Sequence, residues 1–201
     1  MRVLVACEFS GVVRRAFRER GHDAWSCDLL PALDDSPFHI TGDVLPHLAW
    51  GWDLLVAHPP CTYLASSGLH WNKKRPEREK LTHDAMIFVF NLMGEGFMDN
   101  SIPKIALENP IGRISTAFRK PDQIIQPWQF GHPESKATCL WLKGLPKLEP
   151  TCILEKPPSG RWENQTPSGQ NKLGPSPERW KKRSVTYEGI AKAMAEQWGG
   201  K

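Results

Sequence analysis

The chain has 201 residues, a formal net charge of +4 and 40% hydrophobic residues, a length that suits one well-buried domain and is short for two. It contains no run of about 18 apolar residues of the kind that crosses a membrane, and Glu8 interrupts the N-terminus before a signal-peptide core of about 7 residues is complete. We therefore expect a single domain, residues 1–201, that has no membrane partner and is located in the cytoplasm.

The first half of the chain alternates between strand and helix patterns. Short apolar, β-rich runs lie at 2–7, 23–28 and 52–58, a weaker one is "HITGDV", and "PKIALENP" adds another. Helical spacing follows the first run as far as Gly21, and a second helix is expected with Thr82 as its N-cap and apolar residues from 85 to 97. This alternation predicts a parallel sheet with helices on both faces.

The second half of the chain has a different pattern. The runs "DQIIQPWQFG" and "ATCLWLKG" predict two strands that form an antiparallel hairpin at the sheet edge. Residues 151–183 contain five prolines and little hydrophobic periodicity, which predicts a long loop. A closing helix is indicated by apolar residues that share one face, namely Ile190, Ala191, Met194, Ala195 and Trp198.

Positive charge is concentrated in two stretches. Residues 151–183 hold seven Lys or Arg against three Glu, and residues 72–80 hold five against two. A solvated face is the ordinary explanation for one such run, and for 151–183 a disordered tether is another. Two runs in an otherwise balanced chain favour a polyanionic partner.

Acidic side chains follow the ends of the predicted strands, where an open parallel sheet binds its ligands. Glu8, Asp28, Asp43 and Glu108 occupy such positions. The first turn has the single glycine Gly11 instead of a Gly-x-Gly-x-x-Gly pattern, so a dinucleotide site is not predicted. A nucleoside cofactor without a pyrophosphate, such as S-adenosyl-L-methionine, fits an acid that accepts hydrogen bonds from ribose hydroxyls. A turn or cap role for Asp28 is the alternative.

Cys61 follows two prolines at the end of an apolar run and has three possible roles. The five cysteines lie far apart with no Cys-x-x-Cys spacing, so we expect free thiols. His58 is separated from Cys61 by Pro-Pro and His70 is isolated, which argues against a metal site, and none is expected. A structural thiol remains open, as does a nucleophile whose thiolate is stabilised by nearby cations.

Several ordered segments resemble the motifs of the C5-cytosine-specific DNA methyltransferases. "HPPC" follows an apolar strand, "ALENP" ends the next one, and "FGHPESKATCLWL" comes later. In that family a Pro-Cys loop supplies the nucleophile, a Glu-Asn pair holds the target base, and a Gly-x-Pro-Gln-x-Arg-x-Arg segment precedes a hydrophobic strand. "FSG" is similar to the family's cofactor turn and "SVTYEGIAKAMAEQW" to its last motif. The order matches over nearly the whole chain.

The resemblance implies a Rossmann-like, S-adenosylmethionine-dependent methyltransferase fold and a set of catalytic residues. Cys61 would attack carbon 6 of cytosine, which makes carbon 5 reactive toward the methyl group, and Glu108 would hold N3 and the exocyclic amine. Asn109 and Pro60 would shape the nucleophile loop. In the later motif Glu134 replaces Gln, and Lys136 replaces the first Arg, so a bidentate guanidinium is lost at that position.

The resemblance also implies the residues of the cofactor site. Phe9, Ser10 and Gly11 would form the first turn, Asp28 would bind the ribose and Asp43 would lie near the adenine amine. Pro59 would complete the site from the nucleophile loop. Where the family has further glycine after this turn, the chain has two valines.

DNA is the implied partner, and the target base would be flipped out of the stack. The family's target-recognition domain is replaced here by the basic loop of residues 151–183. The expected nucleic-acid contacts are Lys73, Lys74, Arg75, Arg161, Trp162, Arg179, Lys181, Lys182 and Arg183. Arg and Trp side chains can clamp phosphates and stack on bases. Single-stranded and double-stranded DNA stay open, as does a separate partner that supplies specificity.

Two other functions are compatible with these residues. One is a methyltransferase of the same fold that acts on a nucleotide, an RNA or an exocyclic amine, because "HPPCTY" also resembles the Pro-Pro-aromatic motif of amino-methyltransferases. The other is a catalytically silent nucleic-acid-binding module, because a fold alone does not establish activity. A modified sulfonium cofactor that delivers another group is also open.

Overall fold

One seven-stranded sheet, with strand order β3-β2-β1-β4-β5-β7-β6, forms the centre of the molecule. The computed structural model describes residues 1–97, 100–169, 171–174 and 176–200. Its strands are β1 (Arg2–Ala6), β2 (Asp23–Asp28), β3 (His39–Thr41), β4 (Leu54–Ala57), β5 (Lys104–Asn109), β6 (Gln123–Ile125) and β7 (Thr138–Lys143). Pairing is parallel from β3 through β5, whereas β7 is antiparallel to β5 and to β6. The expected α/β fold, with a mostly parallel sheet and an antiparallel edge pair, is confirmed.

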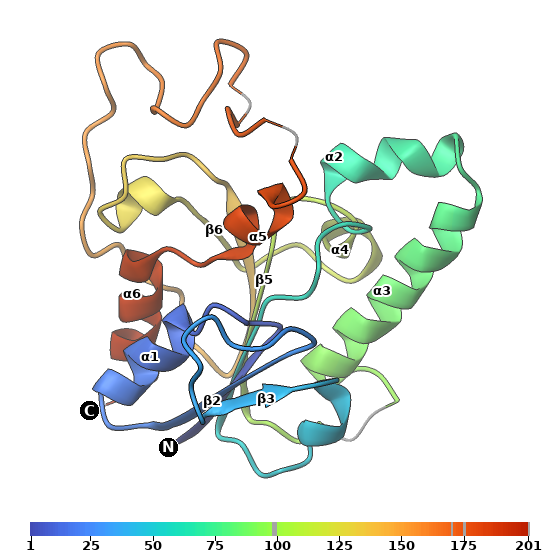
Figure 1. The fold of residues 1–201 in the computed structure, drawn as a ribbon, viewed down its shortest axis with the longest axis vertical. Helices are drawn as coiled ribbons and strands as arrows, with labels where there is room; N and C mark the ends of the chain where they lie inside the picture. Colours follow the sequence, from blue (N-terminus) through green and yellow to red (C-terminus); the bar gives the residue numbers. More distant parts are fainter. Residues whose placement is uncertain (98–99, 170, 175, 201) are drawn as a thin grey trace.

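Helices cover both faces of this sheet, as Figure 1 shows. The longer ones are α1 (Val12–Glu19), α3 (Glu77–Met93) and α6 (Glu188–Trp198), and the short ones are α2 (Ser66–Leu69), α4 (Ile114–Ala117) and α5 (Arg179–Ser184), with 3₁₀ turns η1 (Leu45–His47), η2 (His70–Lys73) and η3 (Pro127–Gln129). In the described part of the chain, no helix is long and apolar enough to cross a membrane.

The strands are apolar throughout because both of their faces are buried. Val5 and Val56 belong to the cluster that α1 and α6 cover, while Leu4 and Leu55 belong to the cluster that α3 covers. Alternate residues of one strand therefore enter two separate cores. This explains why the runs at 2–6 and 54–57 show no polar alternation in the sequence.

The closing helix α6 packs against α1 on one face of the sheet. All five residues of its predicted apolar face are buried, which confirms that prediction. Trp198 is among the largest fully enclosed side chains, and its Nε1 donates a hydrogen bond to the carbonyl oxygen of Pro146 at 3.0 Å. The end of the described chain thus completes the core that its first helix begins.

Helix α3 starts six residues earlier than the sequence pattern indicated, so the prediction of Thr82 as its N-cap is wrong. Pro76 precedes the helix, and Glu77 and Glu79 occupy its first turn, where negative charge is favourable. Thr82 lies buried inside the helix and accepts a hydrogen bond from Asn72 at 2.9 Å. The helix also ends earlier than expected, because Gly94 adopts a left-handed conformation after Met93.

The segment 151–183 is a loop only as far as Glu178. Its last residues form the short helix α5, so the prediction of a loop that extends to residue 183 is wrong. The physical reason is local: Arg179 to Arg183 consist of good helix formers and lie beyond the last proline. The helix presents its basic residues to solvent or to the neighbouring loops.

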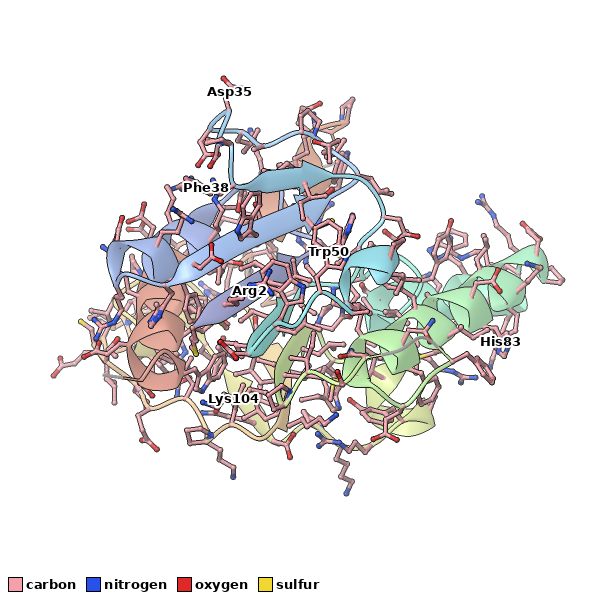
Figure 2. The ribbon with its side chains drawn as sticks, turned by 90° about the horizontal axis from the view of Figure 1, so that it is seen from below. Arg2, Asp35, Phe38, Trp50, His83 and Lys104 are labelled. Carbon is pink, nitrogen blue, oxygen red and sulfur yellow. The ribbon has the colours of Figure 1, made fainter. Side chains whose placement is uncertain are left out.

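At the amino end of β1, the side chain of Arg2 contacts the segment before β4, and Figure 2 shows this end of the sheet from below. The guanidinium of Arg2 donates hydrogen bonds to the carbonyl oxygens of Trp50 and Gly51 and lies 4.7 Å from the ring centroid of Trp52. The carboxyl ends of the strands lie on the opposite side, where the loops carrying the candidate residues emerge.

Replacement of Trp198 by Ala is expected to lower the free energy of unfolding by about 3–5 kcal/mol, because it leaves a cavity between α6 and the sheet. Urea unfolding followed by circular dichroism measures this change. The control is Lys192→Ala on the exposed side of the same helix, where a change within about 0.5 kcal/mol is expected. Equal losses in the two variants would contradict the packing described here.

Candidate active site

Three neighbouring strands bring the candidate residues to one edge of the sheet. In the register of β1, β4 and β5, Ala6 lies opposite Ala57, which lies opposite Leu107. The next residues on the last two strands are His58 and Glu108, so parallel pairing places these side chains next to each other on the same face. Strand register therefore builds the centre of the site before any loop conformation is considered.

His58 and Glu108 form a buried pair. Their Nδ1 and Oε2 atoms are 3.1 Å apart, and their side chains are 7% and 19% exposed. Burial alone would raise the pKa of the Glu108 carboxyl, but the hydrogen bond from His58 and the charges of Lys136 and His58 lower it below its usual value. An ionised carboxylate only accepts hydrogen bonds, so Nδ1 is the donor. The Nε2 atom is buried without a partner among the described residues.

A second buried carboxyl group, Glu8, lies on the other side of His58. Its oxygens accept hydrogen bonds from the backbone N–H groups of Val13 at 2.6 Å and Arg14 at 3.2 Å, at the start of α1. Burial raises the pKa of Glu8, although the charge of His58 and these N–H groups oppose the change. The N–H groups of a helix N-terminus commonly bind phosphate, and here Glu8 already uses them.

The Pro-Pro-Cys loop follows β4 in the chain and is hydrogen-bonded to the end of β5. Asn109 is buried and donates a hydrogen bond from Nδ2 to the carbonyl oxygen of Pro59 at 2.7 Å. The carbonyl oxygen of Cys61 accepts from the N–H groups of Leu64 and Ala65, which forms a tight turn. A Cβ at Gly112 would collide with the backbone of Leu64, so only glycine permits this close approach. These contacts fix the loop, in which Pro60 and Cys61 are exposed.

Charged groups of both signs surround the Cys61 sulfur. Cys61 reaches the surface, yet partial desolvation and then the negative charge of Glu108 raise the pKa of its thiol. The cations Arg183 and Lys136 act in the opposite direction. Because such effects require proximity, Cys61, Glu108, Lys136 and Arg183 belong to one site. These residues come from four separate segments of the chain.

Lys136 connects the site to α5. Its Nζ donates a hydrogen bond to the carbonyl oxygen of Arg183 at 2.9 Å, and its backbone N–H donates to Gln126 Oε1 at 2.9 Å. The preceding residue but one, Glu134, accepts from Tyr187 at 2.6 Å and from Asn164 at 3.2 Å. The segment before β7 thus binds both the basic loop and the start of α6.

The turn after β1 lies under a buried ion pair. Arg14 is 1% exposed and pairs with Asp34. In the loop of Asp34, the backbone N–H of Leu33 donates a hydrogen bond to the carbonyl oxygen of Phe9 at 2.9 Å. Gly11 has a φ of 69°, and a Cβ there would meet the Arg14 guanidinium. Glycine is therefore required at this position for conformation and for space. Ser10 is buried and donates to Glu8 at 3.4 Å.

Asp28 and Asp43 converge at the carboxyl ends of β1 to β3. Burial, then Asp28, then Asp43 raise the pKa of Cys27 to about 12, so both acids lie near this thiol. Asp28 is half-buried, its own pKa is raised by burial, and its Oδ1 accepts from Leu30 at 2.9 Å. Asp43 is exposed and its Oδ1 accepts from Leu45 at 3.0 Å. The backbone N–H groups at the start of α1 are already used by Glu8, which disfavours a pyrophosphate there.

The predicted nucleic-acid contacts do not form one continuous set. Lys73, Lys74 and Arg75 lie around Trp71 on the α2–η2 segment, with the last two 5.1 and 5.5 Å from its ring centroid. Helix α5 carries four of the predicted contacts, which are Arg179, Lys181, Lys182 and Arg183. The Nζ atom of Lys181 lies 3.3 Å from Oε2 of Glu178. Arg161 is exposed in the basic loop.

Trp162 differs from the role expected of it. It is only 6% exposed and stacks against Trp128 with ring centroids 6.3 Å apart and planes at 11°. The ring is thus part of the packing of the basic loop and is not a freely exposed stacking surface. An indole in a proline- and glycine-rich loop gives no sequence signal of a partner more than thirty residues away.

Sequence reasoning missed three features of this region. These are the buried ion pair of Arg14, the contact of His58 with Glu108, and Trp128 as the partner of Trp162. A signal existed for Arg14, since it stands between Val13 and Phe17 on the apolar face of α1. Among the described residues, no group of three His, Cys, Asp or Glu side chains could hold a metal ion.

Comparison with solved structures identifies the fold. The methyltransferase EhMeth of Entamoeba histolytica superposes with a TM-score of 0.51 at 15% identity, over 77% of this chain and 57% of that one. A mutant of DNMT2 from Spodoptera frugiperda gives a TM-score of 0.41 at 16% identity, over 78% of this chain and 55% of that one. The chain thus spans a little over half the length of these proteins. The likeness to EhMeth shows a methyltransferase-type fold.

Comparisons of sequence give no further relative. No protein-family model matches the chain, and no curated protein matches it.

Replacement of His58 is expected to raise the pKa of Glu108. Asn retains a donor near the position of Nδ1 but carries no charge, so His58→Asn should give a smaller increase than His58→Leu, which removes both contributions. Titration of ¹³C-labelled Glu carboxyl groups by NMR measures this, with the signal assigned by its loss in Glu108→Gln. An unchanged Glu108 titration in His58→Leu would disprove the pairing.

The pKa of Cys61 is expected to move in opposite directions when its two kinds of neighbour are neutralised. Lys136→Gln should raise it and Glu108→Gln should lower it, because the first removes a cation and the second an anion. The pH dependence of Cys61 alkylation by iodoacetamide, followed by mass spectrometry, gives both shifts, and Cys152 in the same samples serves as the internal control. Shifts in the same direction would exclude this electrostatic account.

Proposed function

We propose that the chain is an S-adenosylmethionine-dependent methyltransferase that modifies cytosine at C5 in DNA through a transient Cys61 adduct. One observation carries this proposal: His58 and Glu108 are hydrogen-bonded at the carboxyl edge of the sheet, and Asn109 of the same strand end binds the loop that carries Cys61. The methyltransferase-type fold supports the general reaction, and the resemblance of the "PPC" and "ENP" motifs supports the specific one.

The reaction needs a nucleophile and a group that grips the edge of the base. Carbon 5 of cytosine is weakly nucleophilic until a group adds to carbon 6. A thiolate serves because it adds near neutral pH and leaves again afterwards. In the proposed step the Cys61 Sγ–C6 bond forms while the ring electrons move toward carbon 5. The exocyclic amine donates a hydrogen bond to Glu108, and N3 accepts a proton that Glu108 takes up when the base binds. After the transfer, a water molecule takes the proton from carbon 5, which restores the double bond and releases the thiolate.

The charges of the free site link substrate binding to thiol activation. The Glu108 carboxylate raises the pKa of Cys61 in the free protein, while Lys136 and Arg183 lower it. A cytosine edge that donates hydrogen bonds to Glu108 offsets its negative charge. The cations then act on Cys61 with less opposition, so the thiolate becomes more populated when the base is in place. His58 holds the carboxylate in this orientation from its far side.

S-Adenosylmethionine supplies the electrophilic methyl group when bound. Asp28 and Asp43 are suited to hold the nucleoside, because carboxylates accept hydrogen bonds from ribose hydroxyls and from the adenine amine. Phe9, Ser10 and Gly11 form the turn after β1 that we propose for this site, and Pro59 would complete it from the nucleophile loop. The partner we propose is DNA, with an extruded target base and with the basic residues on its phosphates.

The raised pKa of Cys61 favours a second candidate. An exocyclic amine needs no thiolate for its methylation, and His58 stands in "HPPCTY" where amino-methyltransferases carry Asp, Asn or Ser. In that reaction the amine nitrogen would attack the methyl group directly, and Cys61 would be dispensable. The two candidates share the fold and the cofactor and differ in the role of the sulfur.

Adduct trapping separates these functions. With S-adenosylmethionine and DNA that contains 5-fluorocytosine, the wild type should form a complex stable to SDS, because fluorine at C5 blocks release of Cys61. Cys61→Ser should abolish the complex, and Cys152→Ser, at another exposed cysteine, should not. The same variants with unmodified DNA and labelled cofactor report methyl transfer.

Each outcome of this experiment decides between the candidates. An adduct in the wild type and in Cys152→Ser supports the C5 reaction. Methyl transfer that is equal in the wild type and Cys61→Ser, without an adduct, points to the amine reaction. Neither adduct nor transfer on single-stranded or duplex DNA would overturn the proposed activity and leave a binding module. A separate specificity partner would be revealed by activity that requires cell extract.

A further inference from the structure

A cavity of about 600 Å³ lies between the basic loop and the segment that connects β6 to β7, and Ser135 in its wall directly precedes Lys136 of the candidate active site. Its walls include Trp128 and Ser135 on one side and Lys156, Arg161, Trp162 and Gln165 on the other. This volume is within the usual range for small-molecule sites. In Figure 1 the basic loop extends above η3, close to α5. None of the catalytic or cofactor residues described above lines the cavity.

We propose that this cavity binds the base of a nucleotide adjacent to the target cytosine on the same DNA strand, with its phosphate held by Arg161 and Lys156. The inference rests on the proposed function for the identity of the target base. A base held there is unpaired, so the proposal predicts a preference for single-stranded DNA.

The aromatic wall suits a planar base. Trp162 is fixed in the interior, since its backbone N–H donates to Gln165 Oε1 at 3.0 Å and its ring is nearly parallel to that of Trp128. Trp128 is half-buried and completes the wall. Stacking of a base on such a side chain contributes about 1–3 kcal/mol and tolerates all four bases. Trp162 therefore acts by orienting the wall, although it is too buried to stack on an exposed strand.

The charge of the cavity matches a phosphate. Lys156 and Arg161 are exposed at its rim, and no Asp or Glu is among the described residues that line it. Arg161 donates a long hydrogen bond to the carbonyl oxygen of Pro167 at 3.5 Å, whereas a guanidinium carries five N–H donors. The remaining donors can bind a phosphate oxygen in the bidentate manner that arginine favours.

The chain before β7 connects one wall of the cavity to the candidate active site. Asn164 exchanges hydrogen bonds with the backbone of Ser135, donating to its carbonyl oxygen at 2.9 Å and accepting from its N–H at 3.0 Å. The next residue is Lys136, whose charge acts on Cys61 and Glu108. In our proposal, a strand whose target base reaches Cys61 follows this segment and places a neighbouring nucleotide in the cavity.

Affinity for single-stranded oligonucleotides tests the proposal. Fluorescence anisotropy compares oligonucleotides that carry one 5-fluorocytosine and an abasic site either immediately beside it or six nucleotides away. An adjacent abasic site should weaken binding by about tenfold on one side of the target, and the distant one should not. Trp128→Ala should remove this difference. Trp71→Ala, at an exposed indole of the α2–η2 segment, should retain it. Retention of the difference in Trp128→Ala, or its absence in the wild type, overturns the proposal.

Exposed substitutions keep the test valid if Trp128→Ala fails to fold. Arg161→Gln and Lys156→Gln should each reduce the slope of log affinity against log salt concentration by roughly 0.7, the value for one phosphate contact on a single strand. Unchanged slopes in both variants would overturn the phosphate assignment.

Photocrosslinking separates the failure of this proposal from the failure of the proposed function. An oligonucleotide with 5-iodouracil next to a cytosine should crosslink to the peptide containing Trp128, whether or not methyl transfer occurs. Crosslinks at Trp128 without any Cys61 adduct would support the cavity and count against the C5 reaction. Adduct formation with crosslinks only on the α2–η2 segment would support the reaction and overturn the cavity.

Discussion

The parallel register of β1, β4 and β5 is the constraint on which the candidate site depends. Because Ala57 lies level with Ala6 and with Leu107, the residues that follow it meet those of both neighbouring strands. His58 is therefore placed between the carboxyl groups of Glu8 and Glu108, and Asn109 reaches the carbonyl oxygen of Pro59. A shift of one residue in the pairing of β4 with β5 would turn His58 and Glu108 to opposite faces and separate the nucleophile loop from Asn109.

The electrostatics of this site combine groups with opposing requirements. Glu108 is stabilised as an anion, and the same charge disfavours the thiolate of Cys61. Lys136 favours both anions, and its hydrogen bond to the carbonyl oxygen of Arg183 places α5 over the same region. Ionisation of Glu108 therefore opposes ionisation of Cys61 until a ligand offsets the charge of Glu108. Such arrangements of shifted pKa values are typical of functional sites.

The sequence predicted those features that depend on local pattern. The buried strands, the antiparallel pair and the apolar face of α6 all follow from short periodicities, and the structure confirms them. The start of α3 was missed because Pro76 and the contact of Asn72 with Thr82 outweigh the apolar spacing. The burial of Trp162 against Trp128, and the pairing of Arg14 with Asp34, depend on contacts between distant segments that no local pattern contains. The sequence predicted that the candidate residues follow the ends of neighbouring strands. The hydrogen bond between His58 and Glu108 could not be predicted, because it depends on the register of β4 with β5.

The packing of α6 on α1 has a consequence for biosynthesis. The first helix leaves the ribosome well before α6, and the apolar surface that Phe17 and Val13 share with Met194 and Trp198 stays open until α6 has also emerged. The nascent polypeptide therefore carries an unfinished hydrophobic face while the residues between α1 and α6 are translated. Chains of this kind are prone to aggregate and are natural clients of chaperones. Final compaction, with β1 already paired to β2, awaits the last helix.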